Sequence, residues 1–230
     1  MTRMHRRLRR VLCSFAMLAC ASAVAGSPQF IDLRRIEPVH GDANAGKTKA
    51  AVCGACHGAN GISPAPMFPN LAGQRAEYLY WQLVEFQREA RPESPMTSQI
   101  ANHDDASLRD LAAYFASLPP GPPVRATDTA MFERGAALYR NGDPARGTPP
   151  CQGCHGVDGR GNPLAQTDAR YSAYPSLRGQ HAEYLIQRLK GFRAGKYELS
   201  SNGRIMTPVA KTLDDESIKA IAQWLEAGID

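Results

Sequence analysis

The sequence predicts an all-α protein made of two tandem domains of similar structure. Three observations support this prediction. The two halves of the 230-residue chain match each other segment by segment, as expected for an internal duplication. Apolar residues recur at helical spacing, and no segment shows the alternation that is typical of a strand. A proline-rich stretch separates the halves, and such a stretch cannot continue a helix.

The first 25 residues predict a secretory signal. Five arginines lie within the first ten residues, a short apolar run follows at 11–24, and small residues at Ala23 and Ala25 offer a cleavage site. We therefore expect cleavage near Ala25, a leader that spans residues 1–25, and export to the periplasm. The alternatives are a membrane anchor and a lipoprotein in which Cys20 carries the lipid.

Without this leader the chain is electrically neutral, which argues against nucleic acid as a partner. The whole chain has 27 basic and 22 acidic residues, and the leader holds five arginines and no acidic residue. The mature chain therefore has 22 basic residues against 22 acidic ones. No basic run remains that could follow a phosphate backbone.

The duplication sets the predicted domain limits. Three pairs of segments match: FPNLAGQ (68–74) with YPSLRGQ (174–180), GQRAEYLYWQLVEFQ (73–87) with GQHAEYLIQRLKGFR (179–193), and DDASLRDLAAYFASL (104–118) with DDESIKAIAQWLEAG (214–228). Four prolines lie between the repeats and favour an extended connector. We therefore expect an N-terminal domain at 26–118, a linker at 119–128 and a C-terminal domain at 129–230.

Each repeat predicts two amphipathic helices, because its apolar residues fall three or four positions apart. In the middle of the repeats these residues are Leu79, Leu83 and Phe86, then Leu185, Leu189 and Phe192. At the end of the repeats they are Leu108, Leu111, Phe115 and Leu118, then Ile218, Ile221 and Leu225. Aspartates at 104–105 and 214–215 stand where helix N-caps belong. Residues 58–70 and 142–176 are rich in Gly, Pro, Asn and Asp, and predict loops.

The motif Cys-x-x-Cys-His occurs twice, as CGACHG and as CQGCHG. Two cysteines at i and i+3 of a helical turn lie on one face, where they can form thioether bonds with the two vinyl groups of one haem. The histidine that follows can bind the iron, and the whole motif is the signature of c-type haem attachment. We therefore predict two haem c groups, one per domain. The expected residues are Cys53, Cys56 and His57 for the first group, and Cys151, Cys154 and His155 for the second.

Three other uses of the cysteines are the alternatives. A zinc site needs four ligands, usually from two such pairs that lie close together, whereas these motifs begin at residues 53 and 151 and each already has a histidine. A thioredoxin-like redox pair needs no second copy. A disulfide within either motif would be strained. Two copies in an exported, duplicated chain favour haem.

Methionine is the expected second axial ligand, because its soft thioether favours ferrous iron. The repeats select Met96 and Met206, since each lies eight residues before the aspartate that opens the last helix. Met67 has no counterpart in the second repeat, so we expect it to be a packing residue. We expect Met131 to be a core residue. His103 is the alternative ligand for the first iron, but Leu213 occupies its place in the second repeat.

The ring N–H of an axial histidine needs an acceptor that fixes its tautomer. Pro69 and Pro175 occupy matching positions in the loops that follow the two histidines. We predict that their carbonyl oxygens accept these hydrogen bonds. We expect His40 and His181 to be ordinary surface or loop histidines.

These motifs resemble the dihaem class I cytochromes c of the cytochrome c4 type, over about residues 40–230. The resemblance implies two cytochrome c domains related by a pseudo-twofold axis, with haem propionates that face each other. It also implies electron transfer in the periplasm, to a terminal oxidase or from a membrane complex. The second repeat departs from the first in its longer loops, so the surface and the partner near the second haem need not match those of the family.

The leading hypothesis is a monomeric, non-catalytic electron carrier with two His/Met haems. Its partners would be redox proteins such as a membrane respiratory complex or a terminal oxidase, with peripheral membrane association left open. One alternative is a cytochrome subunit of a dehydrogenase or oxidase complex. Another is a dihaem peroxidase, which would need an iron with an open or displaceable sixth position, and a methionine candidate in both repeats argues against it.

Overall fold

The computed structural model describes residues 29–91, 94–122 and 124–227, so the predicted signal at 1–25 lies outside the described residues. Within these ranges the chain forms helices and loops, with no strand and three isolated bridges. The predicted all-α fold class is therefore confirmed. Among the helices described here, none has both the length and the apolar character needed to cross a bilayer.

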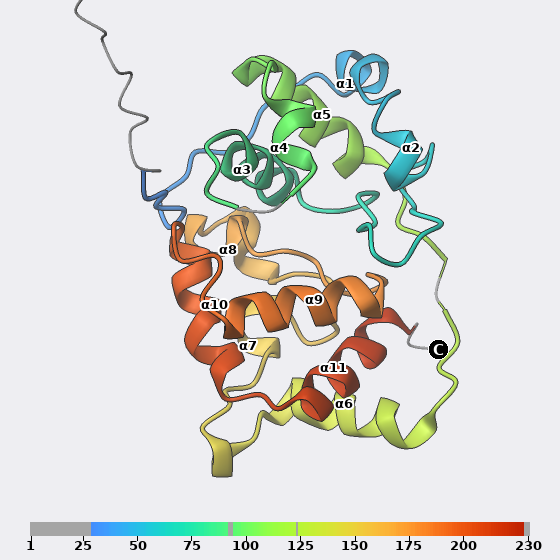
Figure 1. Cartoon of the computed structure of the whole chain (residues 1–230), viewed down its shortest axis with the longest axis vertical. Coiled ribbons are helices and arrows are strands. Elements are labelled where there is room, and N and C mark those ends of the chain that lie inside the picture. The colour runs from blue at the N-terminus through green and yellow to red at the C-terminus, as the bar shows by residue number, and fades with distance from the viewer. Residues whose placement is uncertain (1–28, 92–93, 123, 228–230) are drawn as a thin grey trace, which may run out of the picture.

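The first half of the chain, coloured blue to green in Figure 1, forms most of one hydrophobic core, to which Ala173 of the second half also belongs. Its helices are α1 (Ala43–Lys49), α2 (Gly54–His57), α3 (Ala76–Gln87), α4 (Met96–Ile100) and α5 (Asp105–Ser117). The predicted apolar stripe of the last helix faces this core, because Leu108, Leu111 and Phe115 are all buried.

The second half, coloured yellow to red, repeats this arrangement with additions. Its elements are α6 (Thr129–Asn141), η1 (Pro144–Arg146), α7 (Gln152–His155), η2 (Pro163–Gln166), α8 (Ala169–Ser172), α9 (Ala182–Arg193), α10 (Ser201–Lys211) and α11 (Asp215–Glu226). Ile218, Ile221 and Leu225 of α11 are buried as predicted. The three additions to this repeat are the short turns η1, η2 and α8, which lie within the region 142–176 that the sequence predicts as loop.

Two matched glycines show that the duplication extends to backbone packing. Gly46 of α1 lies against α5, and Gly135 of α6 lies against α11. A Cβ on Gly46 would overlap the backbone carbonyl of Asp110, and one on Gly135 would overlap that of Ala220. The two carbonyls occupy equivalent positions in the repeats. Each repeat thus brings its first and last helices together through a glycine.

Helix α10 is, like α1 and α6, a helix that the sequence analysis did not predict. It runs from Ser201 to Lys211 and contains Gly203 and Pro208, two residues that disfavour helix interiors. The structure explains the glycine, because a Cβ there would overlap the backbone carbonyl of Tyr197. Close packing has therefore overridden helix propensity in this element.

The segment at 29–36 crosses from the first domain to the second. Ile31 N–H donates to the carbonyl of Leu199 at 2.8 Å, and Ser201 N–H donates to the carbonyl of Ile31 at 3.0 Å. Leu33 N–H donates to Ser201 Oγ at 2.9 Å, and the Leu33 side chain is fully buried. The N-terminal segment therefore joins the start of α10 to the core of the first domain.

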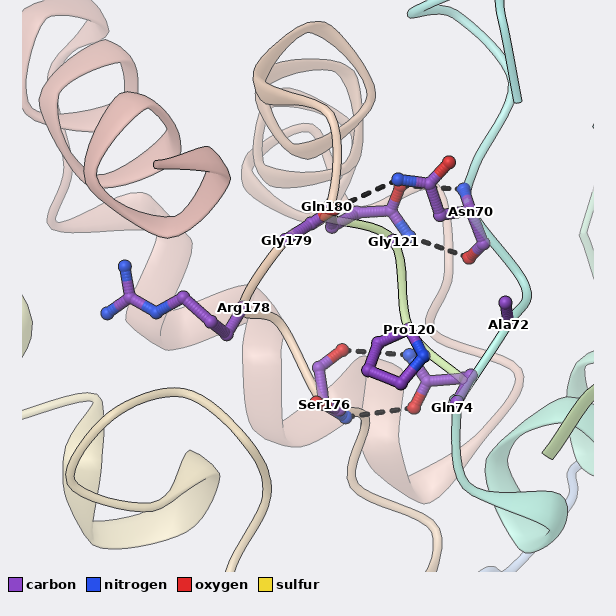
Figure 2. A pocket seen from close by; sticks show the side chains of 10 residues that line it. Asn70, Ala72, Gln74, Pro120, Gly121, Ser176, Arg178, Gly179 and Gln180 are labelled. Atoms are coloured by element: carbon purple, nitrogen blue, oxygen red, sulfur yellow. Dashed lines mark hydrogen bonds between the residues drawn. The ribbon is translucent and has the colours of Figure 1, made fainter. Parts of the chain in front are cut away.

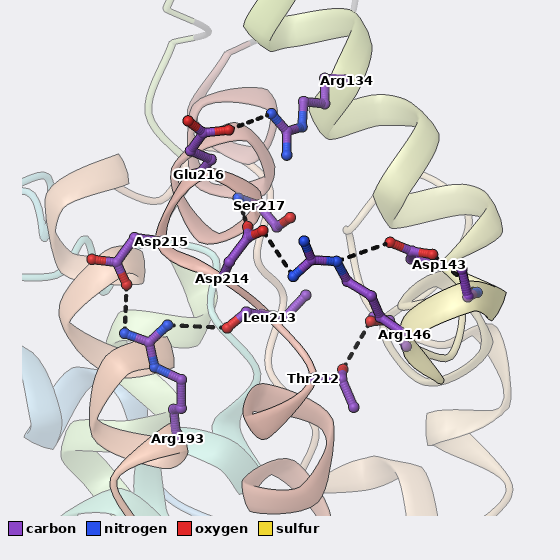
Figure 3. Close-up of polar contacts among 12 residues, drawn as sticks. Arg134, Asp143, Arg146, Arg193, Thr212, Leu213, Asp214, Asp215, Glu216 and Ser217 are labelled. Atoms are coloured by element: carbon purple, nitrogen blue, oxygen red, sulfur yellow. Dashed lines mark hydrogen bonds and ion pairs between the residues drawn. The ribbon is translucent and has the colours of Figure 1, made fainter.

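The start of α11 is a polar junction between several elements (Figure 3). Asp214 accepts a hydrogen bond from Ser217 N–H, which confirms the predicted N-cap. Arg146 of η1 pairs with Asp214 at 2.9 Å, and Arg193 of α9 pairs with Asp215 at 2.5 Å. The pKa of Asp214 lies below its usual value, mainly because of the cap hydrogen bond and to a smaller extent because of the Arg146 charge. Asp104 caps α5 in the same way.

Replacing Gly135 by alanine tests the helix contact. An added methyl group improves intrinsic helix propensity by about 1 kcal/mol, but here it must displace the α11 backbone. We expect a fall in unfolding free energy of roughly 1–3 kcal/mol, measured by chemical denaturation of the mature protein. Gly153→Ala is the control, because its Cβ enters open space and the first repeat has Ala55 there. A more stable Gly135→Ala variant would contradict the packing.

Replacing Asp214 by alanine tests the cap of α11. We expect a loss of about 1 kcal/mol at neutral pH. Because the folded pKa of Asp214 is lowered, its stabilisation is present above the unfolded value of about 3.9 and is lost as the pH falls through the folded value. The gap between wild type and variant should therefore close in acid, whereas Asp214→Asn should keep the cap. Unfolding followed at several pH values checks this, and a gap that persists in acid would count against it.

Candidate functional site

Two four-residue helices, α2 and α7, present the cysteines and histidines of the repeated motif. His57 N–H donates to the carbonyl of Cys53 at 3.0 Å, and His155 N–H donates to the carbonyl of Cys151 at 3.0 Å. Each motif is thus one helical turn, so its two cysteines, three positions apart, lie on the same side. This local geometry is the one that the sequence predicts.

A glycine ends each of these turns directly after the histidine. Gly58 has a φ of 76° and Gly156 a φ of 81°, values that other residues rarely adopt. A Cβ on Gly58 would also overlap the carbonyl of Ile62, and one on Gly156 that of Gly161. The chain can therefore turn away from the site at once and fold back as a loop.

The four cysteines of the two motifs form no disulfide bond. Burial raises the pKa of Cys53 and Cys154, and raises that of Cys151 to about 11. The thiols of Cys53, Cys151 and Cys154 are therefore uncharged at neutral pH. Within the described parts of the chain, no group of three or more His, Cys, Asp or Glu side chains is arranged to hold a metal ion.

The two histidines are buried and held by the predicted carbonyl groups. His57 Nδ1 lies 2.9 Å from the carbonyl oxygen of Pro69, and His155 Nδ1 lies 3.2 Å from that of Pro175. The predicted contacts are confirmed. Because a carbonyl only accepts, Nδ1 must carry the proton, and Nε2 keeps its lone pair. Burial lowers the pKa of both rings, which favours the neutral form that can bind a metal.

An aromatic side chain accompanies each prolyl carbonyl. Phe68 packs against the ring of His57, and Tyr174 against that of His155, with ring centroids 6.1 Å apart in both pairs. Phe68 and Tyr174 occupy matching positions in the repeats and directly precede the two prolines. One short loop in each domain thus fixes both the position and the hydrogen bonding of the imidazole.

The paired thiols and the neutral imidazole fit a covalently attached haem. Two thiols on one face can add to vinyl groups, and a buried imidazole with a free Nε2 lone pair can bind iron. The prolyl carbonyl is the outer-shell acceptor that such a histidine needs. Both copies of the site have all of these features.

The methionines lie on different helices in the two domains. Met96 is the first residue of α4 and packs half-buried against the first core, whereas Met206 lies half-buried within α10. Met67 is 52% exposed, so the prediction that it packs inside the protein is wrong. Met131 is half-buried on α6.

His181 has a contact that the sequence prediction missed. We expected an ordinary loop histidine, but Nε2 of this half-buried ring lies 3.0 Å from the carbonyl oxygen of Ser63 in the other domain, and Nδ1 lies 3.5 Å from Glu226. Its counterpart, Arg75, donates from Nε to the carbonyl of Ser172 at 3.1 Å. The alignment pairs these two positions, but it gives no indication that both reach across the domain contact.

Comparison with known proteins places both halves of the chain in one family. The cytochrome c family matches residues 43–119 and again residues 132–228. Cytochrome c4 of Azotobacter vinelandii is 43% identical over 195 residues, which cover 81% of this chain and 89% of the relative. A thiosulfate dehydrogenase electron acceptor of Thiomonas intermedia is 34% identical and covers 78% of this chain and 79% of its own length.

A solved structure agrees with these sequence matches. The crystal structure of reduced recombinant cytochrome c4 from Pseudomonas stutzeri superposes with a TM-score of 0.71 at 38% identity. The match covers 82% of this chain and 99% of that one. The similarity therefore extends over both domains.

Proposed function

Because the chain belongs to the cytochrome c family, as a dihaem electron-transfer protein of the cytochrome c4 type, we propose that it carries single electrons between redox partners in the periplasm. Each of its two cytochrome c domains binds one haem c covalently. The observation that carries the proposal is the pair of buried histidines, each with Nδ1 on a prolyl carbonyl and Nε2 available.

The cysteines would attach one haem to each domain. Cys53 and Cys56 would form the thioether bonds of the first group, and Cys151 and Cys154 those of the second. The bound haem supplies an iron that changes between two oxidation states. The helical turns α2 and α7 hold the thiols on one side, so they also place the following histidine against the same group.

His57 and His155 would each bind iron through Nε2. The Pro69 and Pro175 carbonyls fix the tautomer and raise the basicity of the two rings. Phe68 limits rotation of the first ring. A rigid, buried ligand changes little when the oxidation state changes, and this rigidity suits a carrier.

Met96 and Met206 would complete the coordination. Their support is the matching register in the two repeats, together with a half-buried position in each domain. A thioether ligand stabilises the ferrous state and raises the reduction potential. With both irons closed in this way, small molecules would not bind, and the protein would have no peroxidase activity of its own.

The leader and the comparisons suggest where electrons enter and leave. The basic and then apolar leader at 1–25 supports export to the periplasm. The donor and acceptor would be other redox proteins, such as a membrane respiratory complex, a terminal oxidase or a dehydrogenase. The relative named as a thiosulfate dehydrogenase electron acceptor supports a dehydrogenase as donor. We propose that the protein works as a monomer and associates at most peripherally with the membrane.

Replacing one methionine by alanine tests the ligand assignment. In Met96→Ala or Met206→Ala, haem should stay attached, because the cysteines are intact, but one of the two irons should become open. We expect carbon monoxide to bind half of the haem in the reduced variant, and half of the methionine-to-iron charge-transfer absorption to disappear in the oxidised one. Met67→Ala is the control and should bind no carbon monoxide, because Met67 is exposed.

The same proteins discriminate carrier from peroxidase. The wild type, mixed with peroxide and a reduced donor, should show no sustained turnover, whereas either methionine variant should gain some. Fast turnover by the purified wild type would contradict the carrier function. Loss of both charge-transfer signals from one substitution would contradict one methionine per haem.

A further inference from the structure

The two domains exchange a symmetric pair of glutamine contacts, shown in Figure 2. Gln74 of the first domain donates from Nε2 to the carbonyl of Ser176 at 2.8 Å and accepts from Ser176 N–H at 2.9 Å. Gln180 of the second domain donates from Nε2 to the carbonyl of Asn70 at 2.9 Å and accepts from Asn70 N–H at 2.8 Å. Each amide thus binds the backbone of a single residue across the domain contact.

The residue that each glutamine binds directly follows the proline that holds an axial histidine. The N–H of Ser176 and the carbonyl of Pro175 belong to one peptide group, and so do the N–H of Asn70 and the carbonyl of Pro69. One side of each peptide group therefore donates to a glutamine of the other domain, while its other side accepts from the histidine of its own domain.

The glutamine side chains are fixed in these positions. Both residues are 7% exposed. Gln74 Oε1 also accepts from Arg75 N–H, and Gln180 Oε1 from His181 N–H, both at 3.0 Å. These N–H groups belong to the N-cap residues of α3 and α9. The helix start of one domain thus holds the oxygen that contacts the peptide group of the other.

This arrangement has an electronic consequence. A peptide group whose N–H donates a hydrogen bond is polarised, and its carbonyl becomes a stronger acceptor. A stronger acceptor at Nδ1 makes the histidine more basic, and a more basic ligand favours ferric iron. A glutamine oxygen in one domain would therefore lower the reduction potential of the haem in the other domain.

We propose that Gln74 is a positioning residue for the second haem and Gln180 for the first, each acting through the prolyl peptide group of the opposite domain. The inference rests on the proposed ligation of iron by His57 and His155. It predicts that each glutamine lowers the reduction potential of the haem in the opposite domain.

The test uses Gln74→Leu and Gln180→Leu in the mature protein with both haems. Leucine is chosen over alanine because a cavity of about 30 Å³ already lies among these residues, and a smaller side chain would admit a water that could replace the glutamine oxygen. The potential of each haem is measured by redox titration followed by NMR of assigned haem methyl groups. We expect Gln74→Leu to raise the potential of the second haem only, and Gln180→Leu that of the first only.

Two further measurements separate this role from a purely structural one. The Nδ1–H resonance of His155 should move toward a weaker hydrogen bond in Gln74→Leu, and that of His57 should stay in place. Gln74→Met also removes the oxygen that accepts from Ser176 N–H, so the same resonance should move in the same direction as in Gln74→Leu. Gln187→Leu, on the exposed face of α9, is the matched control and should change neither potential.

The outcomes that would overturn the proposal are distinct. A loosened domain contact would let water reach both haems and lower both potentials, and this result would reject the specific crossed effect. Unchanged potentials in both leucine variants would reject it too. If the wild-type protein lacked histidine ligation altogether, the proposed function would fail first. Normal histidine ligation with no crossed shift would leave that function intact and reject the inference alone.

Discussion

The hydrogen bond from each buried histidine to a prolyl carbonyl is the interaction on which the rest of this structure depends. It leaves Nε2 as the only ring atom that can bind iron, and it does so in both domains, through Pro69 and Pro175. In the proposed function the cysteines would determine where the haem is attached, and this carbonyl would determine which atom of the histidine faces it. The loop that carries the proline is therefore as much a part of the site as the Cys-x-x-Cys-His motif.

Several features of the fold maintain that contact. The glycines at 58 and 156 let the chain turn directly after the histidine, and Phe68 and Tyr174 pack on the rings. The N–H of each prolyl peptide group then donates a hydrogen bond to a glutamine of the opposite domain. The two domains that the duplication produced are therefore not independent carriers. Each domain supplies part of the surroundings of the other domain's histidine.

The sequence predicted the features that a repeat or a short motif encodes. The caps at Asp104 and Asp214, the apolar stripes and the prolyl acceptors follow from local spacing compared between two copies. Helix α10 was missed because Gly203 and Pro208 oppose helix formation by propensity, and only the contact with Tyr197 explains the glycine. Two contacts join residues that are far apart in the sequence: the hydrogen bond from Ile31 to Leu199 and the contact between His181 and Ser63. No local sequence pattern could have indicated them.

The central claim is that each of the two irons has one histidine nitrogen and one methionine sulfur as axial ligands. Near-infrared magnetic circular dichroism of the oxidised protein tests it most directly, because the charge-transfer bands depend on both axial ligands. The account predicts histidine–methionine bands with an intensity that corresponds to two haems per chain. A bis-histidine band, or a band of an open iron in half or more of the haem, would contradict it.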